Sequence, residues 1–470
     1  MALLRYIGLV IMMLPAASHA QYRDFETLLP QGSQLALAIY SANGEPEYQY
    51  RSEALMAPAS TLKLLTASAA WLQLGADFRY RTQLLGPAPD GHRLPGDLVL
   101  SMVGDPTFER ADLYRMLQQL KQQGVDHIDG DLLIQGLGFS GYDRAPGWPW
   151  DDLGICYAAQ SSAVILDGNC ARVWLRIAND TVRIDKPAHL PLRFSHNVQL
   201  GNGTESCPLE MQRHSQNHYQ LSGCIDKPTP LAIAIDDPGH YVSQVVSQQL
   251  LQLGITLAGS VRHVDAPLST APKRLLQHQS QALPALLTRV LQDSNNQISD
   301  SLLRTLAHDL YQQDASFQLG IQAMKSILQR DLGLAFDSGT LFDGSGLSRY
   351  NLLSADQLAS LLTHWLNNPK LSPLLELLPV SGESGTLKYR RSLKQLPYKV
   401  SAKTGSFNQV SNLAGIVQRP DQAPVIVVQL VNGIAGDPSV TQDLLSQFEH
   451  HLYQCIQTDC FAPQQKRQRP

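Results

Sequence analysis

The distribution of hydrophobic and polar residues near the start of the chain predicts a hairpin followed by a helix. Residues 34–40 are mostly apolar and predict a buried strand, an Asn-Gly pair then predicts a turn, and residues 47–50 predict the returning strand. Small and apolar residues follow and predict a helix that begins near Ser60. We expect this helix to end at Gly75, because glycine commonly ends helices.

The middle of the chain has a different pattern, which predicts short strands together with two amphipathic helices. Apolar positions recur at the spacing of one helix face between about residues 111 and 123, and again from Pro238 to Gly254. Residues 156–234 contain short strand-like runs, turns and four cysteines, and they predict a small β module. Further strands are predicted at residues 80–85, 98–103 and 128–134.

A helical pattern returns from about residue 273, and strands are predicted near residues 400–402, 412–417 and 424–431. Because 470 residues are too many for one ordinary core, the simplest organisation is a domain that is interrupted and later resumes. The predicted boundaries are 1–20 for a signal peptide, 21–80 with 272–462 for the split domain, 81–155 with 235–271 for an inserted α/β domain, 156–234 for a small β domain, and 463–470 for a disordered tail.

The first twenty residues predict an export signal. Arg5 supplies a positive charge, residues 7–14 supply an apolar core, and Ser18-His19-Ala20 supplies a small-residue cleavage pattern. The mature chain is therefore expected to begin at Gln21, after cleavage behind Ala20. The apolar run is too short for a comfortable membrane span, so a retained anchor is the weaker alternative. We expect a periplasmic protein, soluble or loosely membrane-associated.

The cysteines agree with export. All six lie in the expected mature chain as three neighbouring pairs, which predict disulfides between Cys156 and Cys170, Cys207 and Cys224, and Cys455 and Cys460. No Cys-x-x-Cys or His-Glu-x-x-His motif occurs, so neither a metal site nor a cofactor is expected. The formal net charge is −4, and the basic residues near the C-terminus are more simply a disordered end than a nucleic-acid site.

Ser60 and Lys63 are the first candidate catalytic residues. Residues three apart share one face of a helix, so the Lys63 amine can reach the Ser60 hydroxyl. Burial disfavours the charged form of a lysine, and a neutral lysine can act as the base that activates a serine. The helix N-terminus also favours negative charge near Ser60. A Ser-x-x-Lys motif alone is more often a helix cap with a solvated lysine, so this interpretation depends on residues further along.

Two further motifs follow in the resumed part of the split domain. Ser294-Asn295-Asn296 precedes a predicted helix, and Lys403-Thr404-Gly405 lies on a predicted strand. Each motif alone is usually a helix cap or an edge strand. The order Ser-x-x-Lys, Ser-x-Asn, Lys-Thr-Gly is much more specific, because class A β-lactamases and penicillin-binding proteins share it.

With these motifs, the chain resembles the D-alanyl-D-alanine carboxypeptidases/endopeptidases of the penicillin-binding protein 4 type, peptidase family S13. Residues 104–107, 146–152, 343–349 and 385–387 also resemble signatures of that family. The 234 positions between Ser60 and Ser294 (294 − 60) accommodate two inserted domains. The resemblance implies an α+β fold, in which a β-lactamase/transpeptidase-like domain is interrupted by two inserted, β-rich domains. That domain would combine an antiparallel sheet flanked by helices with a helical subdomain.

The resemblance also implies an acyl-enzyme reaction. Ser60 would attack the carbonyl of the penultimate D-Ala, with neutral Lys63 as its base. Repulsion from Lys403 would help keep Lys63 deprotonated. Ser294 would bridge the two lysines and pass a proton to the leaving amine. Asn296 would hydrogen-bond both the substrate amide and Lys63.

The remaining implied roles concern substrate binding. Lys403 and Thr404 would bind the terminal carboxylate, and Gly405 would let the substrate approach the backbone because a Cβ there would crowd it. The backbone N–H groups of Ser60 and Ser406 would form the oxyanion hole.

Two charged residues are implied contacts for the diaminopimelate side chain. Asp152, or its neighbour Asp151, would pair with the ammonium group, and Arg349 would pair with the carboxylate. The alternative is that the aspartate caps a turn and Arg349 forms a structural ion pair. The implied partners are peptidoglycan stem peptides, with β-lactam antibiotics as inhibitors. The oligomeric state stays open, with a homodimer as one option.

Two other functions share parts of this evidence. A class A β-lactamase needs a glutamate after Ser-x-Asn, but the chain has none from Asn295 to Leu375. A non-catalytic wall-binding scaffold would retain the fold, yet it has no need for the complete set of motif residues. Both alternatives are less favoured than a serine peptidase.

Overall fold

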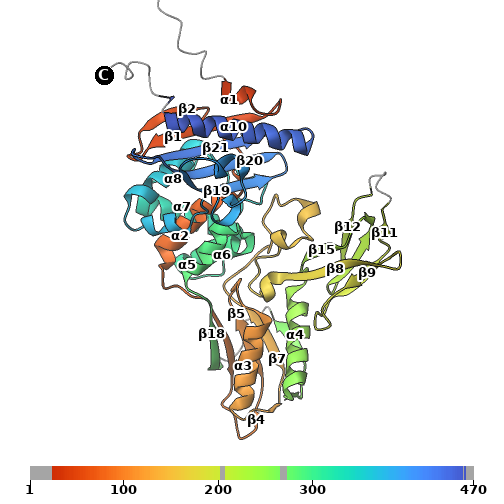
Figure 1. Cartoon of the computed structure of the whole chain (residues 1–470). Coiled ribbons are helices and arrows are strands. Elements are labelled where there is room, and N and C mark those ends of the chain that lie inside the picture. Colours follow the sequence, from red (N-terminus) through yellow and green to blue (C-terminus); the bar gives the residue numbers. More distant parts are fainter. Residues whose placement is uncertain (1–23, 202–206, 265–271, 459, 462–470) are drawn as a thin grey trace, which may run out of the picture.

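The computed structural model describes residues 24–201, 207–264, 272–458 and 460–461, and it consists of a split domain and an inserted part (Figure 1). The predicted signal peptide and C-terminal tail lie outside the described residues. Within these ranges, no helix combines the length and the apolar character that a bilayer span requires.

A five-stranded antiparallel sheet in the order β19-β20-β21-β1-β2 forms the centre of the split domain. Leu35 and Leu37 of β1 pack toward α10, whereas Ala36 and Ala38 face a layer of helices, because neighbouring residues of a strand point to opposite faces. The strands are β1 (Gln34–Ser41), β2 (Pro46–Tyr50), β19 (Lys399–Phe407), β20 (Val410–Gln418) and β21 (Val425–Asn432). The pairing of β1 with β21 joins segments from opposite ends of the chain.

Helices cover both faces of this sheet. The outer face carries α10 (Pro438–Thr458), with the short α1 (Asp24–Thr27) and α9 (Arg391–Lys394) nearby. The inner face carries α2 (Lys63–Leu74), α5 (Leu283–Gln292), α6 (Asn296–Tyr311), α7 (Phe317–Leu332) and α8 (Ala355–Asn367). The first two turns of α2 are entirely buried, so Lys63 lies inside this hydrophobic layer.

The inserted part contains a second five-stranded sheet in the order β17-β7-β5-β3-β18, which shares a core with α3 (Arg110–Gln122) and α4 (Pro238–Leu253). Its strands are β3 (Arg81–Gly86), β5 (Leu98–Met102), β7 (Leu132–Gly136), β17 (Val261–Val264) and β18 (Lys273–Gln279). A smaller sheet joins β4 (Arg93–Leu94), β6 (His127–Ile128) and β16 (Thr256–Leu257). Because β18 pairs with β3, this sheet includes residues that the sequence analysis assigned to the split domain.

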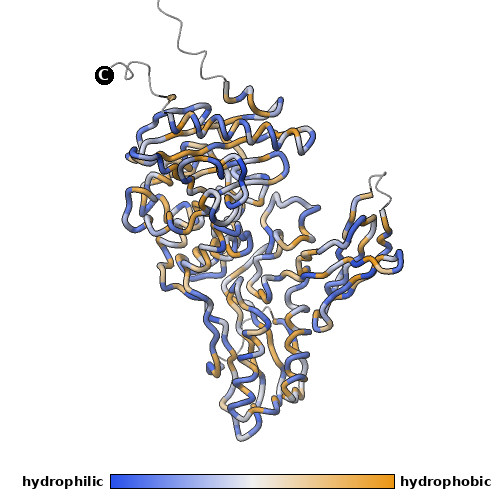
Figure 2. Tube along the Cα trace, in the orientation of Figure 1, coloured by the Kyte–Doolittle hydropathy of each residue, from blue (hydrophilic) through white to orange (hydrophobic). Residues whose placement is uncertain are grey.

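The small β module follows β7 in the chain and contains three little sheets. In the first, β8 (Cys170–Ala178) lies between β15 (Thr229–Ala234) and β9 (Thr181–Asp185). The others join β10 (Arg193–His196), β13 (His218–Ser222) and β12 (Glu210–His214), and β11 (Gln199–Leu200) with β14 (Cys224–Ile225). Hydrophobic residues gather where the sheets and helices of each part face one another (Figure 2).

The three predicted disulfides are confirmed. Cys156–Cys170 and Cys207–Cys224 lie in the small β module, and Cys455–Cys460 closes the end of α10. The first of them ties the start of β8 to the short 3-10 turn Cys156–Ala158.

The chain between β7 and β8 returns from the insertion to contact α6. The Gln297 side chain donates a hydrogen bond to the Gln160 carbonyl at 2.7 Å, and the fully buried Arg304 donates to the Ser140 carbonyl at 2.8 Å. The helix that follows the Ser-x-Asn motif is therefore also the helix that holds the insertion.

Candidate active site

Ser60 lies in a short 3-10 turn, Ala59–Leu62, directly before α2. Ala59 has a φ of 48°, a left-handed conformation that costs an alanine energy, so the turn must be held by its surroundings. Asn412 of β20 helps to stabilise this conformation, because its buried side-chain amide donates hydrogen bonds to the Ala57 carbonyl at 2.8 Å and to the Pro58 carbonyl at 3.0 Å. The sheet thereby fixes the position of the serine.

Two glycines let neighbouring segments approach this turn. A Cβ on Gly405 of β19 would lie 2.5 Å from the Pro58 carbonyl oxygen, and a Cβ on Gly346 would collide with the Ala59 carbonyl. Gly346 also has a φ of 82°, which favours glycine. The sequence analysis expected a side chain at position 405 to crowd the substrate. The structure gives a different reason, because the backbone of the serine turn itself occupies that space.

The Lys63 amine is surrounded by three oxygen atoms. Its Nζ lies 2.8 Å from Ser60 Oγ, 2.6 Å from Asn296 Oδ1 and 2.6 Å from the Ser345 carbonyl oxygen. The amide oxygen and the carbonyl can only accept hydrogen bonds, so they use two N–H bonds of the amine. A neutral amine then has its lone pair left for the Ser60 hydroxyl proton.

Burial favours this neutral form. Lys63 is fully buried, and desolvation lowers its pKa to about 8, against the opposing charges of Asp300 and Asp343. Lys403 is also fully buried, and desolvation followed by repulsion from Lys63 holds its pKa well below the usual value. Burial therefore lowers the pKa of Lys63, as the sequence analysis expected for a buried lysine, and the repulsion between the two lysines acts on the pKa of Lys403.

Ser294 and Lys403 form the second polar pair of the site. The Lys403 Nζ donates to Ser294 Oγ at 2.9 Å and to the Thr404 carbonyl at 2.9 Å. Ser294 has a φ of 57°, so the backbone before α6 turns sharply at this residue. The Thr404 hydroxyl donates to the Thr386 hydroxyl at 2.8 Å, which links the Lys-Thr-Gly strand to residues 385–387.

Asn296 connects the catalytic lysine to the insertion. Its Oδ1 accepts from Lys63, while its Nδ2 donates to the Tyr157 carbonyl at 2.8 Å. These two partners fix which end of the amide faces the lysine. The Tyr157 hydroxyl in turn donates to the Asp152 carboxylate. The insertion therefore contributes directly to the site.

Asp343 organises the loop that brings the Ser345 carbonyl to Lys63. Its buried carboxylate accepts from the Gly346 N–H at 2.8 Å and from the Trp148 indole N–H at 2.9 Å. The sequence analysis noted residues 343–349 and 385–387 only as signatures. It missed the roles of Asn412 and Tyr157, because no local pattern shows which distant backbone group each side chain contacts.

Six of the predicted site residues line one cavity of about 560 Å³, whereas Thr404 and Gly405 of β19 are not part of its lining. Lys63 and Lys403 lie beneath it, fully buried. Its lining includes, from the predicted set, Ser60, Ser294, Asn296, Ser406, Asp152 and Arg349, and in addition Pro149, Asp151, Tyr157, Gly346, Leu347, Phe407 and Asn408.

Arg349 and Asp152 give the wall of this cavity charged groups of both signs. The Arg349 guanidinium donates to the Asn408 carbonyl at 3.1 Å and lies 3.6 Å from the centre of the Phe407 ring. Partial burial lowers the Arg349 pKa, and the neighbouring carboxylates of Asp152 and Asp151 oppose this shift. Within the described ranges, no group of three His, Cys, Asp or Glu side chains is placed to bind a metal ion.

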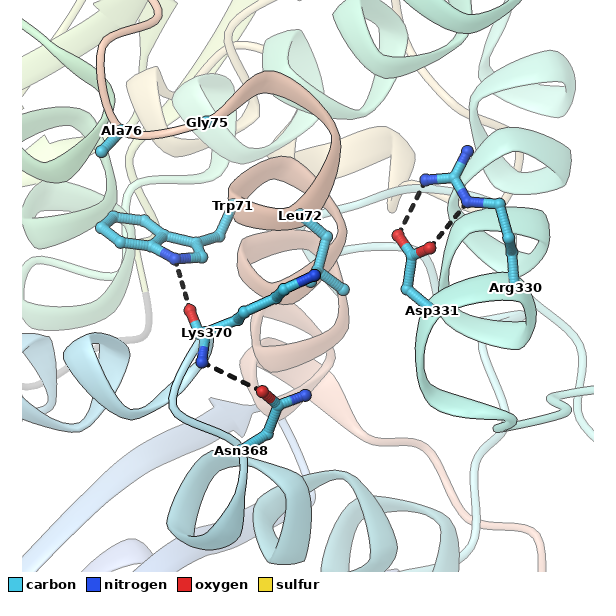
Figure 3. A pocket seen from close by; sticks show the side chains of 8 residues that line it. All are labelled: Trp71, Leu72, Gly75, Ala76, Arg330, Asp331, Asn368 and Lys370. Carbon is cyan, nitrogen blue, oxygen red and sulfur yellow. Dashed lines mark hydrogen bonds and ion pairs between the residues drawn. The ribbon is translucent and has the colours of Figure 1, made fainter.

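A larger cavity of about 720 Å³ lies at the ends of α2, α7 and α8 (Figure 3). Its charged groups are Lys370 and the Arg330–Asp331 ion pair, and the Trp71 indole donates to the Lys370 carbonyl at 2.7 Å. No hydroxyl or thiol side chain lines it. The predicted nucleophile, Ser60, lines the smaller cavity instead.

Comparison with known proteins finds relatives along nearly the whole chain. A profile of the D-Ala-D-Ala carboxypeptidase 3 (S13) family matches residues 23–452. The chain is 36% identical over 456 residues to D-alanyl-D-alanine carboxypeptidase DacB of Haemophilus influenzae, covering 94% of each protein. It is 27% identical over 433 residues to a D-alanyl-D-alanine carboxypeptidase of Actinomadura sp., covering 87% of this chain and 80% of that one.

Comparison with solved structures points to the same family. The crystal structure of penicillin-binding protein 4 (dacB) from Haemophilus influenzae matches with a TM-score of 0.87, covering 92% of this chain and 98% of that chain at 36% identity. A complex of that protein with a β-lactam matches with a TM-score of 0.82 at 34% identity. These matches confirm both the predicted resemblance and the predicted α+β, transpeptidase-like fold class. The chain belongs to the D-Ala-D-Ala carboxypeptidase 3 (S13) family.

Proposed function

We propose that this protein is a serine DD-peptidase that hydrolyses the terminal D-Ala-D-Ala bond of peptidoglycan stem peptides. The observation that carries the proposal is the 2.8 Å contact between the Ser60 hydroxyl and the buried Lys63 amine. A serine hydroxyl needs a base to become a nucleophile, and a lysine of lowered pKa supplies one. The names of the relatives in two bacteria support the same reaction.

In the first step, Ser60 Oγ attacks the carbonyl carbon of the penultimate D-Ala while its proton passes to neutral Lys63. The backbone N–H groups of Ser60 and Ser406 stabilise the oxyanion. Collapse of the tetrahedral intermediate breaks the peptide bond. The proton that Lys63 took from Ser60 passes by way of Ser294, which contacts Lys403, to the leaving amine, so Lys63 is neutral again for the second step. The product is an ester between Ser60 and the shortened peptide.

In the second step, water attacks the ester carbonyl and releases Ser60. Lys403 and Thr404 bind the carboxylate of the terminal D-Ala in the first step, which restricts the carboxypeptidase reaction to free D-Ala-D-Ala ends. The charged wall formed by Asp152 and Arg349 fits an amino acid side chain that carries both an ammonium and a carboxylate group, such as diaminopimelate. Hydrolysis of D-Ala-diaminopimelate cross-links is a second reaction of the same site.

β-Lactams act on this site as inhibitors. Their ring amide acylates Ser60 as the peptide does, but the leaving amine stays attached through the opened ring. The β-lactam complex of the Haemophilus influenzae protein supports this expectation. The three disulfides fit a protein that works in an oxidising compartment, so we place it in the periplasm.

One experiment distinguishes the peptidase from the two alternatives. The protein is incubated with benzylpenicillin, its intact mass is followed, and D-Ala release from a soluble pentapeptide is measured. A long-lived adduct together with D-Ala release supports the peptidase. Rapid turnover of penicillin without D-Ala release indicates a β-lactamase, and no adduct with no release indicates a scaffold.

Ser60→Ala tests the nucleophile. It removes only an oxygen atom from the turn, so we expect a folded protein with neither adduct nor D-Ala release. The melting temperature of the variant, compared with that of the unmodified protein, serves as the control for folding. D-Ala release that persists in Ser60→Ala would show that the nucleophile is another residue.

A further inference from the structure

The outer face of the β15-β8-β9 sheet carries a row of exposed cationic and aromatic side chains. Along β8, Ala171, Val173 and Leu175 point into the module and are buried, so the intervening side chains point outward. The exposed ones are Arg172, Trp174 and Arg176. Trp174 lies between the two arginines, so this sheet face presents one aromatic ring together with two guanidinium groups.

The strand register adds to this row. Arg183 of β9 lies opposite Arg176, and Asp185 lies opposite Trp174. We call Arg172, Trp174, Arg176 and Arg183 the β8 face. The Arg176 guanidinium lies 4.8 Å from the centre of the Trp174 ring and 3.3 Å from the Asp185 carboxylate. The ring is thus held in place while 39% of the residue stays exposed.

The charge of the β8 face is opposite to that of the protein as a whole. The exposed positions of β8 and β9 carry three arginines and one aspartate, so their formal charge is positive. The whole chain has a formal net charge of −4. An anionic ligand is therefore attracted to this face in preference to the rest of the surface. The Trp174 ring adds a flat apolar surface, which suits the C–H face of a sugar ring.

The β8 face continues toward the active-site cavity. Cys170 begins β8 and lies on the same face of the strand as Arg172, and its disulfide partner Cys156 directly precedes Tyr157, which lines the cavity. At about 3.3 Å per residue, Arg176 lies about 20 Å along the strand from Cys170. The Cys156–Cys170 disulfide therefore ties the end of β8 at which the β8 face begins to the segment that lines the cavity.

We propose that the β8 face binds the peptidoglycan polymer outside the cleaved peptide. The arginines pair with free carboxylates of neighbouring stem peptides, and Trp174 stacks on a sugar ring of the glycan. This proposal rests on the proposed function, because it takes the polymer that carries the scissile peptide as its ligand. The small β module then serves to hold the polymer while the cavity acts on one of its peptides.

The test compares a polymeric substrate with a soluble one. Arg172→Gln/Arg176→Gln and, separately, Trp174→Ala are assayed for co-sedimentation with purified peptidoglycan sacculi and for D-Ala release from sacculi and from a soluble pentapeptide. We expect binding to sacculi to weaken roughly tenfold in the double variant, since exposed charge pairs each contribute modestly. Added salt should reproduce this loss in the unmodified protein. Hydrolysis of the pentapeptide should stay unchanged.

Matched controls separate a specific surface from a general change of charge or hydrophobicity. Arg330→Gln/Lys370→Gln removes two cations beside the larger cavity (Figure 3), and Tyr142→Ala removes an aromatic side chain on a residue that is 80% exposed. Both should bind sacculi as the unmodified protein does. Equal losses in the controls, or unchanged binding in the β8-face variants, would overturn the proposal. If the unmodified protein releases no D-Ala from either substrate, the proposed function itself is wrong.

Discussion

At the scale of single residues, the site depends on keeping a lysine neutral inside the protein. Lys63 lies in a hydrophobic layer of helices, and its two obligate acceptors, Asn296 Oδ1 and the Ser345 carbonyl, leave the lone pair of the neutral amine for Ser60. A solvent-exposed lysine in the same motif would stay protonated at neutral pH. In the proposed mechanism, burial of the lysine rather than the motif itself is therefore what activates the serine.

The pH dependence of acylation follows from this state. Because the base must be neutral and the pKa of Lys63 is lowered to about 8, the rate of Ser60 acylation by benzylpenicillin should rise with pH and level off above about 8. Stopped-flow measurements between about pH 6 and pH 10 test this expectation. Lys63→Arg keeps a cation that cannot lose its proton, and it should lower the rate at least about 100-fold at every pH. A flat profile in the unmodified protein would contradict the role of Lys63.

Asn412 should affect the reaction without touching the substrate. Asn412→Ala removes the donors to the Ala57 and Pro58 carbonyls, so about 1–3 kcal/mol of stability is lost and the serine turn becomes free to shift. A displaced nucleophile reacts more slowly, and we expect acylation by benzylpenicillin to fall about 10- to 100-fold. Urea unfolding and acylation kinetics are measured together.

The control for Asn412→Ala is a variant that loses stability away from the turn. Ser68 accepts from the Trp365 indole and donates to the Leu64 carbonyl inside the helical layer. Ser68→Ala should therefore lower stability comparably but leave the acylation rate within about twofold of the original. Equal effects of the two variants on the rate would mean that Asn412 acts only through stability.

At the scale of elements, the sequence predicts helices and turns that depend on neighbouring residues, and it misses features that depend on pairing between distant segments. Apolar periodicity predicts α3 and α4 close to their observed ranges, because each of these helices buries one face, and a run of small and apolar residues that ends at Gly75 predicts α2, which is buried on all sides in its first two turns. The predicted strand near residues 400–402 is longer, since pairing with β20 extends β19 over Lys399–Phe407 and brings the whole Lys-Thr-Gly motif into the sheet. The turn at Ser60 is a 3-10 turn rather than the first turn of the helix.

The disulfide Cys156–Cys170 lies closer to the site than the predicted domain boundaries indicated. The sequence analysis assigned both of its cysteines to residues 156–234, a small β domain separate from the split domain that carries the three motifs. The structure puts Cys156 next to Tyr157, whose carbonyl holds the Asn296 amide. This disulfide therefore also helps to keep Asn296 oriented toward Lys63, and we predict different effects for the two disulfides of the small β module.

Removing each disulfide in turn tests this difference. The two loops span similar separations of 14 and 17 residues, so both double Cys→Ser variants should lose about 3 kcal/mol. Only Cys156→Ser/Cys170→Ser should also slow acylation, by about tenfold, because the Tyr157 segment is released beside the cavity. Thermal melting and penicillin acylation at a temperature where both variants are folded provide the measurement. Equal acylation rates in the two variants would refute the positioning role.

At the scale of the whole molecule, the site draws on three distant parts of the chain. Ser60 and Lys63 come from the first segment, Ser294, Asn296 and Lys403 from the last, and the Tyr157 carbonyl from the insertion between them. The motif order in the sequence predicted that the first two parts converge. The family resemblance implied that Asp152 of the insertion joins them, but no pattern indicated the Tyr157 carbonyl, because its contact with α6 depends on how the insertion packs.

Arg304 is the residue that fixes this packing. It is fully buried on α6, donates at 3.1 Å to the Ala315 carbonyl of its own part of the chain, and reaches across to the Ser140 and Ser161 carbonyls of the inserted segment. Its guanidinium also lies 3.3 Å from the Asp143 carboxylate. Because a single side chain satisfies carbonyls from both parts, the insertion and the helical layer are expected to unfold together.

Arg304→Met should therefore uncouple the two parts. The methionine fills much of the same volume but leaves the buried carbonyls without donors, so we expect a loss of roughly 3–5 kcal/mol. Urea unfolding is followed by the fluorescence of Trp174 and Trp365 in single-tryptophan versions, which report on the small β module of the insertion and on the helical layer respectively. The unmodified protein should give coincident transitions, whereas Arg304→Met should unfold first at Trp174. Arg330→Met, which breaks an exposed ion pair with Asp331 and an exposed hydrogen bond to Gln73, should cost about 1 kcal/mol and keep the transitions together. Coincident transitions in Arg304→Met would mean that other contacts along α6 suffice to hold the insertion, and that the site does not depend on this arginine for its third part.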